Sequence, residues 1–211
     1  MDYSPSCKPR TLTRRNALGC IVLFGTPTLL SRSLSATAAI AGYVEEVRGQ
    51  VTAALAAQRR ILVPHGDVFL GDEVTSGDRS HAALQLGHDT SLRLGANARV
   101  IIDRFVVNAG GFLTLEAGPL LLDKESDTPG ALQVRGSFGL ITIRGTRVFV
   151  GPSNGVIGVF VVHGLVDVTS GGHSVVIQTG QGTDIAALGT PPTEPHPWGE
   201  GRIRAALASV D

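Results

Sequence analysis

The chain has 211 residues and carries 18 acidic and 18 basic side chains, so its formal net charge is zero. That balance argues against a nucleic-acid-binding protein, which needs a basic surface. Hydrophobic residues make up 43% of the sequence and aromatic residues only 5%, which predicts a globular protein with an aliphatic core. Both cysteines, Cys7 and Cys20, lie near the N-terminus, so the rest of the chain can form no disulfide.

Residues 1–41 differ from the rest of the sequence and have the order of an export signal. They contain five of the 18 basic residues and one acid, then an apolar run from Ala17 to Leu30, then small residues from Ala36 to Ala41. Arg14 and Arg15 directly precede the weakly apolar run, which is typical of a twin-arginine signal. We therefore expect an exported, periplasmic protein.

An uncleaved membrane anchor is the alternative interpretation of this leader. Its apolar run is about 14 residues long and contains Pro27, whereas a spanning helix needs about 20 apolar residues. We therefore expect no stable membrane span once the leader is removed.

Residues 42–188 alternate between short apolar strands and turn residues. Segments such as Ala83 to Leu86 and Ser91 to Leu94 have the two-residue period of half-buried strands, and glycine or aspartate interrupts the pattern every six to ten residues. This predicts an all-β domain. Both a compact β-sandwich and a β-solenoid-like stack of short strands fit the pattern. The segment Ala53 to Arg60 is expected to be a strand end that runs into a loop.

The stretch from Ile141 to Gly151 is apolar at both ends, but its two-residue period changes phase in the middle. The change falls at Arg144-Gly145-Thr146, a motif that we expect to be structural. Either a β-bulge at Gly145 or a sharp bend beside another segment would explain it. The guanidinium of Arg144 is expected to bind freed carbonyls or an acid from a neighbouring strand.

Asn154-Gly155 predicts a hairpin turn between two strands, since both residues tolerate positive φ. The surrounding residues 151–155 also fit G-x-S-x-G, the nucleophile elbow of α/β-hydrolases. That elbow needs a helix after its serine, here Ser153, and a strand is predicted there instead. We interpret the match as a turn.

Residues 189–211 begin with a proline-rich linker. A short amphipathic helix is predicted after Trp198, with Ile203, Leu207 and Val210 on one face. We expect this tail to pack back on the β-domain.

No group of residues in the sequence has the pattern of a reaction centre. The histidines form no H-x-H, H-x-x-H or H-E-x-x-H pair, so we predict no metal site, no cofactor and no catalytic residue. The aspartates Asp67, Asp72, Asp78 and Asp89 stand near glycines, as turn residues do.

Several motifs together resemble the FecR domain of bacterial envelope proteins. They are the runs Gly71 to Leu84, Leu92 to Ala98, Ile143 to Val150, Val161 to Val168 and Gly180 to Gly182, and the most specific is Arg-Gly-Thr followed by a strand and a Val-x-x-Gly-x-Val hairpin. The resemblance spans about Gly49 to Ile185. It implies an all-β periplasmic domain. The relative that gives the family its name relays the occupancy of an outer-membrane iron-siderophore receptor to a cytoplasmic sigma factor.

That relative carries an anti-sigma segment and a membrane helix before its periplasmic part, where this sequence has an export leader. We therefore expect a non-catalytic binding or scaffold module of the envelope, whose partner is an envelope or receptor protein and whose role is contact or signal sensing. A glycan- or peptidoglycan-binding domain is the alternative. The aromatic residues disfavour it, since nearly all occupy core-like strand positions.

Overall fold

The computed structural model describes residues 38–106, 110–125 and 130–211, and these residues belong to one folded unit. Most of the described chain is β-strand, and the strands follow the alternating pattern of the sequence. In β6 (His81–Leu86), for example, every second side chain is buried. Such strands have one apolar face, and they stabilise one another by packing those faces together.

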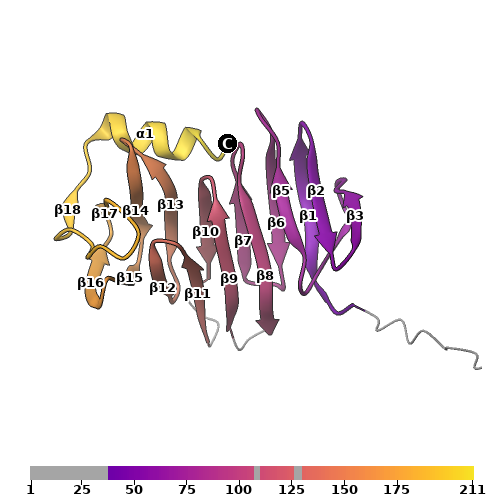
Figure 1. Cartoon of the computed structure of the whole chain (residues 1–211), viewed down its shortest axis with the longest axis horizontal. Coiled ribbons are helices and arrows are strands. Elements are labelled where there is room, and N and C mark those ends of the chain that lie inside the picture. Colours follow the sequence, from indigo (N-terminus) through magenta and orange to yellow (C-terminus); the bar gives the residue numbers. More distant parts are fainter. Residues whose placement is uncertain (1–37, 107–109, 126–129) are drawn as a thin grey trace, which may run out of the picture. The chain divides into compact units, whose positions relative to one another are not determined.

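The strands form two sheets, which we call sheet A and sheet B (Figure 1). Sheet A has the order β18 (His196–Pro197), β17 (Gln181–Ile185), β14 (Val156–His163), β13 (Arg147–Ser153), β10 (Leu120–Lys124), β7 (Thr90–Leu94), β6, β1 (Ile40–Arg48) and β4 (Asp67–Phe69). Sheet B has the order β16 (His173–Gln178), β15 (Leu165–Ser170), β12 (Gly139–Ile143), β11 (Ala131–Gly136), β9 (Gly110–Ala117), β8 (Arg99–Val106), β5 (Glu73–Ser76), β2 (Val51–Leu55) and β3 (Gln58–Ile61).

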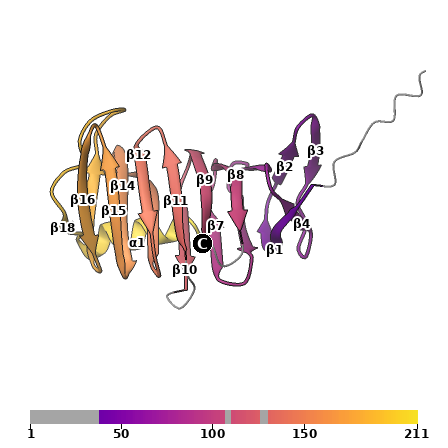
Figure 2. The ribbon, with the colours of Figure 1, turned by 90° about the horizontal axis from the view of Figure 1, so that it is seen from below.

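The chain alternates between the two sheets as it advances from one end of the sandwich to the other (Figure 2). Hairpins such as β6–β7 and β11–β12 stay within one sheet, and sharp corners carry the chain into the other. Nearly all pairs are antiparallel, but β9 and β11 run parallel. The expected all-β class is thus confirmed, as a sandwich that is built up stepwise like a stack.

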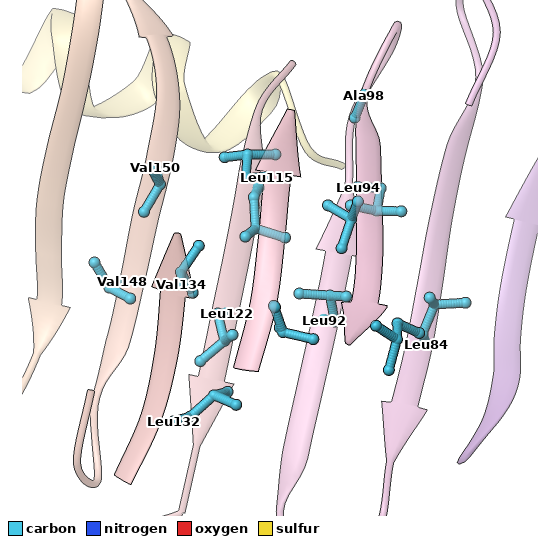
Figure 3. Close-up of a cluster of buried hydrophobic side chains, with 14 of the residues drawn as sticks. Leu84, Leu92, Leu94, Ala98, Leu115, Leu122, Leu132, Val134, Val148 and Val150 are labelled. Carbon is cyan, nitrogen blue, oxygen red and sulfur yellow. The ribbon is translucent and has the colours of Figure 1, made fainter. Parts of the chain in front are cut away.

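Aliphatic side chains from both sheets fill the space between them. Leu84, Leu92, Leu94 and Leu122 come from sheet A and meet Leu115, Leu132 and Val134 of sheet B (Figure 3). Most of these side chains are fully buried. Burial of a leucine or valine side chain contributes about 1.5–3 kcal/mol, so this core supplies the stability that no disulfide can provide.

A second apolar cluster lies on the outer face of sheet A, under the helix α1 (Glu200–Ala208). Its centre is Trp198, whose ring stacks on Phe160 at 5.1 Å between centroids. Two glycines make room for the indole, because a Cβ on Gly158 or Gly182 would lie 2.6 or 2.3 Å from its atoms. The C-terminal tail therefore packs back on the β-domain.

Arg202 holds the same tail by polar contacts. Its guanidinium lies 3.5 Å from the centroid of the Trp198 ring, donates hydrogen bonds to both carboxylate oxygens of Asp184, at 3.1 and 2.5 Å, and donates another to the Ser153 hydroxyl at 2.9 Å. Among the described residues, no helix has the length and hydrophobicity needed to cross a membrane.

One local expectation was wrong. The segment Ala53 to Arg60 is a hairpin of β2 and β3, with Ala56 at φ 52° in its turn. Asp89 lies in the turn before β7 and Asp72 directly follows the turn after β4, as expected, but both side chains are buried: Asp72 binds the guanidinium of Arg60, and the Nζ atom of Lys124 lies 2.6 Å from Asp89. Burial of a carboxylate requires such a partner.

Candidate protein-binding surface

Arg144-Gly145-Thr146 is the corner at which the chain leaves sheet B and enters sheet A. β12 ends at Ile143 and β13 begins at Arg147 in the other sheet, and Gly145 has φ 58°. The phase of the apolar pattern changes at this corner because side chains of β12 face the core from sheet B, whereas those of β13 face it from sheet A. The motif is a bend between sheets, so the alternative of a bulge within one strand was wrong.

Thr146 joins this corner to the next one. Its side chain is buried, and its hydroxyl lies 3.0 Å from the Arg144 carbonyl oxygen and 2.9 Å from the Leu165 carbonyl oxygen, both of which can accept its proton. The same hydroxyl accepts a hydrogen bond from the Leu165 N–H at 3.3 Å. A side chain on Gly164 would collide with this arrangement, since its Cβ would lie 2.7 Å from both the Gly145 carbonyl oxygen and the Thr146 hydroxyl.

A third corner follows the same plan. The Thr179 hydroxyl accepts a hydrogen bond from the Gly164 N–H at 3.0 Å and lies 3.2 Å from the Gly164 carbonyl oxygen. The Gly180 N–H donates to the Val161 carbonyl at 2.8 Å. Threonine hydroxyls thus connect three consecutive corners, and they position β12, β15 and β16 side by side at one end of sheet B.

The side chain of Arg144 lies outside this network. Its guanidinium makes no ion pair or hydrogen bond within the described parts of the chain, so the expected clasp of a carbonyl or an acid is wrong for these residues. Arg144 lines a hollow of about 420 Å³ together with Thr142, Leu165 and Asp167. An unpaired cation beside an exposed leucine is a feature suited to a partner.

The four sheet edges of the sandwich differ in how they are protected. β18 has two residues, one of them Pro197, β4 has three, and β3 carries Arg59 and Arg60. Short length, proline and charge are the usual means of preventing a sheet edge from pairing with another chain. β16 has six residues, HSVVIQ, with no proline and no Lys, Arg, Asp or Glu, so its edge has none of these protections.

Large exposed hydrophobic side chains gather at the two ends of the sandwich. At the β16 end, the exposed fractions are 52% for Leu165, 49% for Val176 and 76% for Leu188. The others lie near β3 and β4, namely Ile40, Tyr43, Ile61 and Val63. The β16 end therefore combines an unprotected edge, apolar side chains and the hollow beside Arg144.

The other predicted site residues do not line the hollow beside Arg144. Asn154 and Gly155 form the turn between β13 and β14, with φ 54° and 81°. A strand follows Ser153, and the Ser153 hydroxyl accepts a hydrogen bond from Arg202, so the G-x-S-x-G sequence here is a turn. No group of three His, Cys, Asp or Glu side chains in the described chain could hold a metal ion. Arg14 and Arg15 lie outside the described residues.

Residues 72–167 match the family model described as FecR protein. These residues form a FecR domain. A comparison with curated proteins found no significant match. Two crystal structures of a Parabacteroides distasonis ATCC 8503 protein, provisionally described as an anti-sigma factor, share its fold, each with 15% identity, a TM-score of 0.53 and 64% of this chain covered. The chain spans 64% and 63% of the length of those two chains, and the likeness establishes the fold alone.

The FecR domain match includes the corner at Arg144-Gly145-Thr146 and the hollow beside it. It ends within β15, whereas β16 and the docked tail lie beyond it. The unprotected edge is therefore supplied by residues that follow the matched segment. Sequence reasoning missed this edge because a strand's place in a sheet is set by its long-range pairing.

Proposed function

We propose that the protein is an exported, non-catalytic interaction module of the bacterial envelope, which binds an extended segment of a partner protein along β16. Its role would be signal sensing or regulation, which the FecR domain and the description of the structural neighbours support. The twin-arginine pattern at Arg14 and Arg15 supports export. The observation that carries the proposal is the unprotected edge of β16.

The main chain of β16 is available for such pairing. Gln178 of β16 pairs with Leu165 of β15, but their main-chain groups point away from each other. The N–H of Gln178 donates to the side chain of Gln181, and both main-chain groups of Leu165 contact the Thr146 hydroxyl. Since main-chain groups point the same way at every second residue of a strand, those of Ser174 and Val176 also point away from β15. Neither residue makes a further main-chain hydrogen bond in the described parts of the chain.

The surroundings of the edge define the kind of segment that would fit. On the outer face, Val176 lies opposite Asp167 of β15, and Asp167 lies opposite Thr142 of β12. On the inner face, the half-buried Val175 borders the core. A bound strand would thus place alternate apolar side chains beside Val175 and Val176, and an acidic residue that reaches the hollow would pair with Arg144.

The test uses a photoreactive amino acid at position 174, with the same amino acid at the exposed position 88 as the control. We expect a cross-link to a specific envelope protein from position 174 and none from position 88. Two variants separate main-chain pairing from side-chain contact: Val176→Pro removes an edge N–H, whereas Val176→Thr keeps it in a β-branched residue. The cross-link should be lost in Val176→Pro and kept in Val176→Thr.

Equal cross-linking by both Val176 variants would refute strand addition. Retention of the protein on purified peptidoglycan, with no protein cross-link, would favour the glycan-binding alternative. The structure offers little for sugar stacking: Phe112 on sheet B is flanked by Arg135 at 4.3 Å and Arg104 at 6.0 Å from its ring centroid, and most other described aromatic side chains are buried.

A further inference from the structure

The small-residue stretch at the end of the leader contains two adjacent candidate cleavage sites. Ala36-Thr37-Ala38 and Ala39-Ile40-Ala41 both have the A-x-A form, and they would be cut after Ala38 and after Ala41. Sequence alone does not separate them. The choice between the two bonds assumes the proposed export, and the structure of β1 decides it.

The later bond, between Ala41 and Gly42, lies inside the folded sheet. The carbonyl oxygen of Ala39 accepts from the Leu70 N–H at 2.8 Å, and that of Ala41 accepts from the Gly87 N–H at 2.9 Å. Ala41 is 4% exposed and belongs to the main core. In this part of β1, Ile40 pairs with Phe69 of β4 and Gly42 pairs with both β4 and β6.

Cleavage after Ala41 conflicts with this arrangement, whether it occurs after or before folding. An endopeptidase binds its substrate as an extended segment with free main-chain groups, and β4 and β6 already occupy those groups in the folded protein. Cleavage before folding would remove the first two residues of β1, the buried Ala41 methyl group and two carbonyl groups that accept hydrogen bonds. The donors of Leu70 and Gly87 would lose their partners.

The earlier bond avoids both problems. Ala39 is exposed and precedes β1. We infer that the exported chain is cut by hydrolysis of the Ala38–Ala39 peptide bond, which adds one water and leaves a carboxylate on Ala38 and an amine on Ala39. The enzyme would be an envelope endopeptidase that accepts small side chains one and three residues before the bond, here Ala38 and Ala36. The mature chain then begins at Ala39 and keeps β1 complete.

The experiment is the expression of the full chain in a bacterium with a twin-arginine pathway, followed by fractionation and intact-mass and N-terminal analysis of the periplasmic protein. The expected N-terminus is Ala39. The matched variants are Ala36→Glu and Ala39→Glu, which place the same charged side chain three residues before the earlier and the later bond. Ala36→Glu should accumulate precursor, whereas Ala39→Glu should be processed like the parent chain.

A periplasmic protein that begins at Gly42, or the reverse behaviour of the two variants, would overturn the assignment and leave the proposed export intact. Unprocessed chain that stays in the cytoplasm would instead refute export, and the assignment with it. A purified chain that starts at Gly42 gives an independent check, since it should melt at a lower temperature than one that starts at Ala39.

Discussion

Substitution of Thr146 by valine tests whether its hydroxyl joins the two corners of the candidate surface. Valine has nearly the same shape, so the change removes the contacts to the Leu165 carbonyl oxygen at 2.9 Å and to the Leu165 N–H at 3.3 Å without leaving a cavity. A buried polar group that loses its partner costs about 1–3 kcal/mol. The longer N–H contact adds little, so we expect the free energy of unfolding to fall by about 2 kcal/mol.

Urea denaturation followed by circular dichroism measures this loss directly. A domain of this size loses about 2–4 °C in Tm per kcal/mol, so Tm should fall by about 4–8 °C. Thr146→Ser is the control, since it keeps the hydroxyl and loses one methyl group, worth about 0.8 kcal/mol. The reasoning fails if Thr146→Val unfolds within about 0.5 kcal/mol of the parent protein, or if serine is as destabilising as valine.

The remaining predictions concern the docked tail. Trp198→Ala should lower the free energy of unfolding by about 3–5 kcal/mol, since it empties the pocket over Gly158. Trypsin should then cleave this variant at Arg202 at low enzyme concentration. A variant that is as stable as the parent protein and is not cleaved would contradict the packing. Gly158→Ala should destabilise by about 1–3 kcal/mol, because its Cβ would lie 2.6 Å from the Trp198 ring, whereas Gly201→Ala, with open space around its Cβ, should stabilise α1 by about 0.5–1 kcal/mol. Thermal melts of the two alanine variants should therefore shift in opposite directions.

Local pattern was sufficient to predict the strands, the turn at Asn154 and the position of the bend at Gly145. The alternation of β6 and the phase change before Val148 are both properties of a few neighbouring residues. The same pattern could not tell a bulge from a corner, because side chains that face the core from sheet A and from sheet B look alike in sequence. Only the pairing of β12 with β15 and of β13 with β14 separates the two.

Long-range contacts account for the features that the sequence did not predict. Lys124 ends an apolar strand and resembles a solvated residue, but it is buried beside Asp89, 35 positions earlier in the chain. The parallel pairing of β9 with β11 has no local signal either. The exposed edge of β16 belongs to the same class, because β16 resembles an ordinary central strand in sequence.

The path of the tail explains why the edge of β16 is left open. In a sandwich that is built up stepwise, each pair of strands covers the one before it, and the last strands in each sheet need another cover. Sheet A receives one: β18 pairs with β17 at its edge, and Trp198 and α1 then cover its outer face (Figure 1). In the described parts of the chain, the tail meets sheet B at the β15–β16 turn, where the Ser170 hydroxyl donates to the Thr190 carbonyl at 2.6 Å. The same tail that completes sheet A thus leaves the main chain of β16 free for a partner, and removal of α1 should weaken the fold without closing that edge.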